Sequence, residues 1–324
     1  MPDRPLVLIT ETLDRGCADW LAKRCEVEWV RFDDPTFNGR LHDADALVVR
    51  TYTQVDQALL DRAPKLKAVG RAGVGLDNID LPACRARGVE VVYTPDANTQ
   101  AVLEYVLGLM LDRFRPRTAL PSHASADVFH EMRKTEVGRQ LSDMTLGIVG
   151  MGRIGTRLAP VAHQMGINVH VTDLLPEAQI RKACPGIPFE FLPHRKLYAS
   201  SDIVTLHADG RTENRRMIDA EAFAAMRPHA LFINAARGML VDHDALTDWL
   251  DTHPDAHAVL DVHDPEPPTP GSPLYDLPNC TLLPHLASRT DTALRNMSWV
   301  VRDIADVLAG QAPRFPAPTG EPIA

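Results

Sequence analysis

The strongest constraint on the fold is an alternation of short apolar runs with helix-like segments. The runs PLVLIT, ADALVVR, LKAVGRAG and EVVYT have the length and β-branched content of strands, and helix-like segments separate them. The alternation restarts at MTLGIVG and continues to CTLLPH near the C-terminus. Such alternation builds parallel sheets with helices on both faces, so the sequence predicts an α/β protein with two doubly wound parallel sheets.

The composition limits the classes of molecule that this protein is expected to bind. Of the 324 residues, 34 are basic and 43 are acidic, which gives a net charge of −9. This acidic balance argues against nucleic acid as the main partner, because contacts to phosphates require a basic face. The most apolar helical segment, AVLEYVLGLML, is too short to span a bilayer, so no membrane partner is expected.

Cysteine usage and the N-terminal segment indicate a cytoplasmic location. The five cysteines are scattered, without a pair or a Cys/His cluster at metal-ligand spacing. The N-terminal MPDRPLVLIT lacks a basic start followed by a long apolar run, so we expect no signal peptide. We therefore expect reduced thiols in the cytoplasm and no metal site.

The segment GMGRIG, residues 150–155, fits the pattern G-x-G-x-x-G between a strand-like run and an apolar-faced helix. Gly150 would permit the tight turn, Gly152 would let the backbone approach a pyrophosphate, and Gly155 would let the helix sit close to the strand. The N–H groups at the start of the helix would then face the pyrophosphate. The alternative interpretation is a strand–helix turn that binds nothing.

Asp173 ends the next strand-like run, NVHVTD, 18 residues after Gly155. A carboxylate at this place can accept both hydroxyls of the adenosine ribose and would repel a 2′-phosphate. Leu174 and Leu175 follow, and neither can neutralise such a phosphate. The pattern therefore favours NAD over NADP as the cofactor.

Three later apolar runs each end near a charged or titratable side chain. Arg237 follows FINAA, Glu266 lies in the loop after AVLDV, and His285 follows CTLLP. Ligands bind outside the carboxyl ends of such strands, so these side chains should gather beside the glycine-rich turn. A guanidinium can hold and polarise a 2-keto acid, an imidazole can give the proton, and a carboxylate can orient the imidazole. The alternative for His285 is that it is one more loop histidine among 13.

The sequence resembles the D-isomer-specific 2-hydroxyacid dehydrogenase family, nearest its D-3-phosphoglycerate dehydrogenase-like branch. The resemblance covers almost the whole chain, roughly from VVRTYT to LPHLASRT. The motifs that carry it are RAGVGLDNID, TPDANTQAVLEYVLGLML, GIVGMGRIG, NAARGMLVD, LDVHDPEP and LPHLAS. The resemblance implies an NAD-dependent enzyme with a Rossmann cofactor domain and a flavodoxin-like substrate domain. It also implies that Arg237, Glu266 and His285 form the catalytic triad.

The resemblance implies further ligand contacts at matching positions. For the cofactor they are Val74, Thr99, Gly150, Gly152, Arg153, Ile154, Gly155, Asp173, His207, Ala208, Ala235 and Asp261, the last holding the nicotinamide carboxamide. For the substrate they are Arg50, Arg71, Val74, Gly75, Asn98, Arg133 and Arg237, with Arg133 reaching in from a partner subunit. The glycines of RAGVGLDNID also fit a backbone nest for an anion, or a plain turn before a helix capped by Asp80.

The resemblance further implies the domain boundaries and the assembly. Residues 1–98 and 297–324 would form a discontinuous substrate domain, and residues 99–296 would form the dinucleotide-binding domain. The segment from 100 to about 140 contains a long apolar helix and an arm without a core of its own, and obligate dimers bury such surface. We therefore expect a homodimer.

Some questions stay open at the level of the sequence. The family usually continues with Pro-Leu-Thr after DIVTLH, whereas this chain has Asp209, Gly210 and Arg211, so the contacts on the adenosine side are undetermined. The arginines favour a substrate with a second anionic group, 3-phosphoglycerate first, and hydroxypyruvate or glyoxylate is the main rival. The alternative function is a redox-sensing NAD-binding protein on the same scaffold.

Overall fold

The computed structural model describes residues 4–319, and the chain divides into two compact units. The first unit comprises the residues up to Ala101 together with those from Ser288 onward, and the second comprises Val102–Ala287. Each unit is built around its own parallel sheet, so the expected pair of doubly wound α/β sheets is confirmed.

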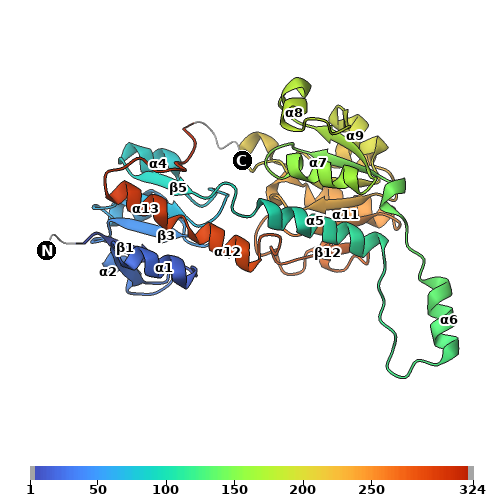
Figure 1. Ribbon diagram of the computed structural model, residues 1–324, viewed down its shortest axis with the longest axis horizontal. Coiled ribbons are helices and arrows are strands. Elements are labelled where there is room, and N and C mark those ends of the chain that lie inside the picture. The colour runs from blue at the N-terminus through green and yellow to red at the C-terminus, as the bar shows by residue number, and fades with distance from the viewer. Residues whose placement is uncertain (1–3, 320–324) are drawn as a thin grey trace. The chain divides into compact units, whose positions relative to one another are not determined.

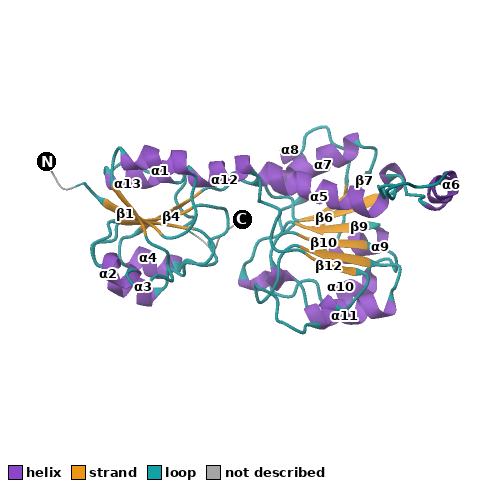
Figure 2. Ribbon diagram, turned by 90° about the horizontal axis from the view of Figure 1, so that it is seen from below, coloured by secondary structure: helices purple, strands orange, loops and turns teal. Residues whose placement is uncertain are grey.

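The first unit has a parallel sheet of five strands in its described residues, in the order β2-β1-β3-β4-β5. Figure 2 shows helices on both faces of this sheet. The strands are β1 (Leu6–Ile9), β2 (Glu26–Trp29), β3 (Ala46–Val49), β4 (Ala68–Arg71) and β5 (Glu90–Tyr93). The helices are α1 (Arg15–Ala22), α2 (Phe37–Leu41), α3 (Gln57–Arg62), α4 (Leu81–Ala86), α12 (Asp291–Ser298) and α13 (Val301–Leu308).

The side chains of β1 show why this sheet needs cover on both faces. Leu6 and Leu8 join the apolar cluster that contains residues of α2, α3 and α4. Val7 and Ile9 join the opposite cluster, with residues of α1 and α13. Successive side chains of a strand point to opposite faces, so a continuous apolar run marks a strand that is buried on both sides.

The second unit has a parallel sheet of seven strands among the residues described, in the order β12-β11-β10-β9-β6-β7-β8. The strands are β6 (Thr145–Val149), β7 (Asn168–Thr172), β8 (Glu190–Phe191), β9 (Ile203–Leu206), β10 (Leu231–Asn234), β11 (His257–Leu260) and β12 (Cys280–Leu282). The helices are α5 (Thr99–Phe114), α6 (Ala126–Thr135), α7 (Gly155–Gln164), α8 (Glu177–Ala183), α9 (His194–Ser200), α10 (Ala220–Ala225) and α11 (His243–Thr252). Short 3₁₀ turns lie at Leu141–Asp143, Thr212–Asn214, Gly238–Leu240 and Pro273–Tyr275.

The two faces of the second sheet have separate cores. One apolar cluster joins residues of α5, α7 and α8 to the sheet, and the other joins residues of α9, α10 and α11. The helix α6 belongs to neither, since it buries no residue, and Figure 1 shows it standing away from the rest of the second unit. Helix α5 begins in the first unit and carries the chain into the second.

The C-terminal helices pack on the first unit. Helix α13 lies against β3, β4 and β5, and α12 lies against α1. The hydroxyl of Ser298, in α12, accepts a hydrogen bond of 3.0 Å from the Asp14 N–H. This packing gives all of α12 to the first unit, whereas the sequence analysis placed the boundary after residue 296. The functional names of the two units stay predictions.

The described part of the chain contains neither a membrane-spanning helix nor a cluster of metal-binding side chains. No helix within residues 4–319 has the length and apolar character to cross a membrane. Among the same residues, no group of three or more His, Cys, Asp and Glu side chains is placed to hold a metal ion.

Glu11 follows β1 and fixes the loop that follows β3. Its carboxylate accepts hydrogen bonds from the backbone N–H groups of residues 50–53 at 2.9–3.2 Å, and from the Thr53 hydroxyl at 2.9 Å. Burial raises the pKa of Glu11, but these hydrogen bonds outweigh burial and lower it below its ordinary value. The ionised carboxylate therefore ties together the carboxyl ends of β1 and β3.

We expect Glu11→Gln to destabilise the protein by about 2–3 kcal/mol at pH 7, because an amide replaces a charged acceptor of several N–H groups. The pKa of Glu11 is lower in the folded protein than its ordinary value of 4.5, so its contribution is present above that value and is lost as the pH falls through the folded pKa. The difference from the native protein should therefore shrink below about pH 4.5. Urea unfolding between pH 3.5 and 7 measures it. The control is Glu26→Gln, at an exposed position of β2, and a difference that is the same at pH 4 and pH 7 would contradict the prediction.

Candidate active site

The glycine-rich turn joins β6 to α7 at the point where the strand order reverses. Strand β6 lies between β7 and β9, and ligands of doubly wound sheets bind at such a reversal. Gly150 has a φ of +96°, which favours glycine. A Cβ atom on Gly155 would lie 2.2 Å from the carbonyl oxygen of Gly150, so only glycine lets α7 begin this close to the turn.

The start of α7 is suited to an anion. The N–H groups of Gly152 and Gly155 have no acceptor among residues 4–319, and Ile154 at the N-cap provides no side-chain cap. Gly152 is exposed, so a ligand can approach its backbone. N–H groups at a helix start carry partial positive charge and bind phosphate, so these residues fit the pyrophosphate of a dinucleotide.

Asp173 supports the turn and remains able to bind a ligand. Its carboxylate accepts the Met151 N–H at 2.6 Å through one oxygen and the Leu175 N–H at 2.7 Å through the other. A carboxylate has about four acceptor positions, so two remain for the hydroxyls of a ribose. The side chain is half-buried, and the exposed Leu174 and Leu175 follow it.

His207 and Ala208 line the other side of the turn. A Cβ atom on Gly150 would lie 2.8 Å from the His207 carbonyl and 2.9 Å from the Ala208 nitrogen. The Nε2 atom of His207 lies 3.2 Å from the hydroxyl of Thr205, and burial lowers the pKa of His207 to about 4. His207 is therefore a neutral polar group beside the turn at physiological pH.

His285 and Glu266, the candidate acid/base pair, are in direct contact. The Nδ1–H of His285 donates a hydrogen bond of 2.6 Å to Oε1 of Glu266, and the two side chains are 40% and 36% exposed. Burial raises the pKa of Glu266, but the hydrogen bond and charge of His285 outweigh burial and lower it. The ionised Glu266 thus fixes the ring of His285 through Nδ1 and leaves Nε2 for a ligand.

Asp261 holds the backbone of His285. The φ of His285 is +55°, in the left-handed region that non-glycine residues seldom adopt. The Asp261 carbonyl accepts the His285 N–H at 2.9 Å, and the Asp261 carboxylate accepts the N–H groups of Leu286 and Ala287 at 2.7 and 2.8 Å. The Tyr105 hydroxyl donates to the same carboxylate at 3.2 Å. Asp261 is 1% exposed as a residue, and its carboxylate keeps one acceptor position on Oδ2, so a nicotinamide contact stays a prediction.

Arg237 stands in the loop beyond β10, next to the loop that carries Glu266. A Cβ atom on Gly238 would lie 2.0 Å from the backbone carbon of His263, so these two loops touch directly. The Arg237 carbonyl accepts a bond of 2.8 Å from the amide of Asn234, and the Arg237 guanidinium donates to the Ala236 carbonyl at 2.8 Å. The buried Ala235 lies in the same turn. The structure therefore places Arg237, Glu266 and His285 at the carboxyl edge of one sheet.

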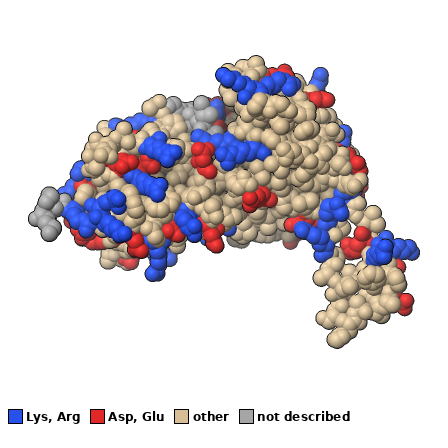
Figure 3. All heavy atoms as spheres, in the orientation of Figure 1, with Lys and Arg blue, Asp and Glu red and all other residues tan. Residues whose placement is uncertain are grey.

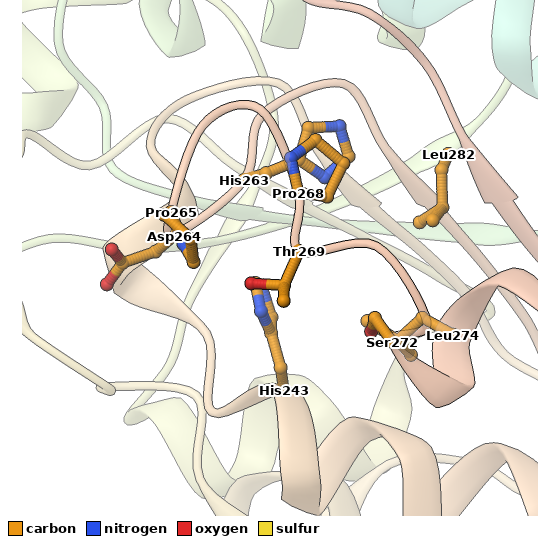
Figure 4. A pocket seen from close by; sticks show the side chains of 9 residues that line it. All are labelled: His243, His263, Asp264, Pro265, Pro268, Thr269, Ser272, Leu274 and Leu282. Carbon is orange, nitrogen blue, oxygen red and sulfur yellow. The ribbon is translucent and has the colours of Figure 1, made fainter.

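A small cavity is lined in part by residues 263–265, 268 and 269, which belong to the loop that carries Glu266 (Figure 4). His243 points from the start of α11 toward Thr269, and its buried Nε2 has no partner in the described structure. The Nε2–H of His263 donates to the Leu283 carbonyl at 2.8 Å, which joins this loop to the end of β12. The cavity, of about 40 Å³, has room for a buried water molecule. None of the three candidate catalytic side chains lines it, so it is not the site of the chemistry.

The first unit contains five of the candidate substrate contacts, namely Arg50, Arg71, Val74, Gly75 and Asn98. Arg50 follows β3 and Arg71 ends β4, and Val49 pairs with Arg71, so the two arginines lie at neighbouring strand ends. A Cβ atom on Gly73 would lie 1.2 Å from Nη1 of Arg71, so the guanidinium lies on the loop that contains Val74 and Gly75. In the same unit, Asp80 caps α4 through the Ala83 N–H, Asn98 precedes α5, and Thr99 is its buried first residue.

Two further sequence candidates belong to the second unit. Arg133 is in the last turn of the exposed helix α6. Asp209 accepts a bidentate hydrogen bond from the guanidinium of Arg211 and another, of 2.8 Å, from the amide of Asn214. The segment that departs from the family after DIVTLH therefore forms a local cluster of hydrogen-bonded polar side chains. Sequence reasoning missed Glu11 and Tyr105, whose partners lie far away along the chain.

Comparisons with known proteins agree on one family. The sequence model of the family described as "D-isomer specific 2-hydroxyacid dehydrogenase, NAD binding domain" matches residues 107–287. The D-3-phosphoglycerate dehydrogenase of Mycobacterium leprae is 37% identical over 311 residues, which are 95% of this chain and 58% of that protein. That of Methanocaldococcus jannaschii is 35% identical over 94% of this chain and 58% of its own length. This chain thus spans less than two thirds of these relatives.

Solved structures show the same fold over the whole chain. The TT0316 protein of Thermus thermophilus has a TM-score of 0.83 and 33% identity, and the match covers 97% of this chain and 100% of that one. The NADPH-dependent glyoxylate/hydroxypyruvate reductase of Sinorhizobium meliloti, in complex with NADP and malonate, has a TM-score of 0.79 and 26% identity, with 97% of each chain covered. The chain therefore belongs to the D-isomer-specific 2-hydroxyacid dehydrogenase family, in its D-3-phosphoglycerate dehydrogenase-like branch.

Proposed function

We propose that this protein is an oxidoreductase that transfers a hydride between NAD and a small D-2-hydroxy acid or its 2-keto acid. The observation that carries the proposal is the hydrogen bond of 2.6 Å between His285 and Glu266, at the sheet edge that also holds Arg237. The glycine-rich turn at the same edge fits a dinucleotide, and the matched family domain is described as NAD binding. In this assignment the second unit is the dinucleotide-binding domain, and the first is the substrate domain.

The residues divide the chemistry among them. NAD, when bound, accepts or supplies the hydride at the substrate carbon. Arg237 holds the substrate carboxylate and polarises the carbonyl, as a planar guanidinium can do with two parallel hydrogen bonds. During reduction the Nε2–H of His285 gives a proton to the forming alkoxide, and during oxidation the same nitrogen accepts it. Glu266 keeps the ring oriented and stabilises the imidazolium.

The first unit supports a substrate with a second anionic group, with 3-phosphoglycerate first. Arg50 and Arg71 stand at neighbouring strand ends, and the two relatives named above are D-3-phosphoglycerate dehydrogenases. Plain hydroxypyruvate or glyoxylate is the rival, since a reductase of that kind shares the fold. A redox-sensing NAD-binding protein is the alternative from another class, and it would show no turnover.

We also propose a cytoplasmic homodimer that forms through the arm around α6. Leu120, Val128, Phe129 and Val137 are large apolar side chains that are 39–78% exposed in this segment. Figure 3 shows that the visible face of the arm is mostly uncharged. Contact with a second copy would bury this surface and bring Arg133 to a partner subunit. Cys17, Cys25, Cys84, Cys184 and Cys280 are free thiols, which supports a reducing compartment.

Replacing His285 with Ala should lower kcat for 2-keto acid reduction by about 10² to 10⁴, because the alkoxide loses its proton donor. NADH binding, followed by its fluorescence, should persist, since it depends on the turn before α7. His163→Ala, at an exposed position of α7, is the control. Turnover of the His285 variant equal to that of the native protein would refute the assignment. A native protein that binds NADH but reduces no 2-keto acid would favour the sensor.

Replacing Asp173 with Asn should weaken NADH binding and narrow the preference over NADPH by about tenfold. The ribose hydroxyls lose a charged acceptor, and the repulsion of the 2′-phosphate of NADPH is lost as well. The amide oxygen can still accept the Met151 N–H of the turn, whereas the N–H of the exposed Leu175 loses its acceptor. Dissociation constants for NADH and NADPH, with the thermal midpoint as a check on folding, measure the effect. An unchanged ratio of the two constants would show that Asp173 does not select the cofactor.

Replacing Phe129 with Asp should convert the dimer to a monomer, because a charge would enter the apolar contact. Light scattering at micromolar concentration gives the mass. Glu131→Ala, at an exposed polar position of the same helix, should leave the dimer intact. A native protein with the mass of a monomer would refute the dimer directly.

A further inference from the structure

Tyr105 supplies a side-chain contact to the buried carboxylate of Asp261. It lies in α5, and its hydroxyl donates a hydrogen bond of 3.2 Å to Oδ1 of Asp261. Within residues 4–319, the other donors to this carboxylate are the backbone N–H groups of Leu286, at Oδ1, and Ala287, at Oδ2. All four residues belong to the second unit, so these contacts lie within one compact body.

The hydroxyl of Tyr105 is not needed for apolar packing. The ring packs against the cluster that contains Ala287 and residues of α5 and α7, and a phenylalanine would present the same ring. A half-buried hydroxyl loses hydration and needs a partner, and among the residues described its partner is Asp261. The hydroxyl therefore contributes a directed contact to the carboxylate.

The direction of this hydrogen bond is fixed. Burial raises the pKa of Tyr105, and the negative charge of Asp261 and the hydrogen bond itself raise it further. The phenol therefore stays protonated across the physiological pH range. An ionised carboxylate has no hydrogen to give, so Tyr105 is always the donor and Asp261 always the acceptor.

The contacts use the two oxygens of Asp261 unequally. Each oxygen of a carboxylate has about two acceptor positions. Oδ1 accepts both the Tyr105 hydroxyl and the Leu286 N–H, whereas in the described residues Oδ2 accepts the Ala287 N–H alone. Without the Tyr105 hydroxyl, an incoming N–H group would find a free position on either oxygen. With it, Oδ2 is the oxygen left for a ligand.

The same carboxylate holds the turn that carries His285. Leu286 and Ala287 are the two residues after His285, and both donate to Asp261. His285 has a φ of +55°, and a side chain in that region persists only where its surroundings hold it there. Rotation of the Asp261 carboxylate would weaken both N–H contacts, so a donor that restricts this rotation also holds the turn.

We propose that Tyr105 is a positioning residue of the candidate active site. Its hydroxyl fills the second acceptor position on Oδ1 of Asp261, directs the carboxamide N–H of a nicotinamide to Oδ2, and holds the turn of His285. Tyr105 acts through Asp261 and takes no part in hydride or proton transfer. The proposal rests on the proposed function for the identity of the ligand.

The first test measures the turn in the protein without cofactor. Tyr105→Phe removes the hydroxyl and keeps the ring, and Tyr275→Phe makes the same change at a tyrosine that is 53% exposed in the same unit. Amide hydrogen exchange at Leu286 and Ala287 should become about threefold to tenfold faster in Tyr105→Phe, the range for the loss of one hydrogen bond. Rates in Tyr105→Phe that match those of Tyr275→Phe overturn the proposal, even if the native protein is an active dehydrogenase.

The second test separates positioning of the ligand from a general loss of stability. It uses reduced 3-acetylpyridine adenine dinucleotide, in which an acetyl group replaces the carboxamide and leaves no N–H for Oδ2. Calorimetry gives the dissociation constants of NADH and of this analogue for the native protein and both variants. Tyr105→Phe should weaken NADH about threefold to tenfold and leave the analogue unchanged. Equal effects on the two ligands, or no effect on either, overturn the role of Tyr105 toward the nicotinamide.

The two measurements also distinguish this proposal from the proposed function. Both are made without turnover, so a selective loss of NADH affinity in Tyr105→Phe supports the proposal even if the native protein reduces no 2-keto acid. A native protein that does not bind NADH refutes the proposed function and the nicotinamide contact together. The exchange rates at Leu286 and Ala287 then decide whether Tyr105 holds the turn.

Discussion

The buried carboxylate of Asp261 is the contact on which the candidate active site depends. It accepts the N–H groups of Leu286 and Ala287 and the hydroxyl of Tyr105, while its own carbonyl accepts the His285 N–H. A buried carboxylate without such donors would be costly, so the acid and the turn stabilise each other. The left-handed conformation of His285 exists inside this arrangement, and it turns the imidazole toward Glu266. The candidate proton donor is thus positioned by backbone contacts that would take no part in proton transfer.

The parallel sheet of the second unit brings the remaining groups to the same place. Strands β10, β11 and β12 are adjacent and in register, so their carboxyl ends lie side by side. The contact between Gly238 and His263 and the bond from His263 to the Leu283 carbonyl lock the three following loops together. A change in any one loop would therefore move the other two, and residues without a direct chemical role can still affect the site.

The features that could be predicted from the sequence are those that depend on residues close together along the chain. Apolar runs, the glycine-rich turn and the charged residues just after strands could all be identified from spacing, because parallel strands present their ends on one edge. The contacts of Asp261 and Glu11 could not. The left-handed turn at His285 depends on hydrogen bonds across 25 and 26 residues, and the bonds of Glu11 cross 39–42 residues. The assignment of α12 to the first unit also depends on a contact between distant parts of the chain, because α12 packs on α1 near the N-terminus.

Carboxylates have three distinct roles in this protein, and their surroundings determine each role. Asp261 is buried and bonded to backbone donors, so it shapes a turn. Glu266 is partly exposed and hydrogen-bonded to an imidazole, so it can stabilise a positive charge on that ring. Glu11 is half-buried and accepts the backbone N–H groups of residues 50–53, so it gives the loop beyond β3 a fixed shape.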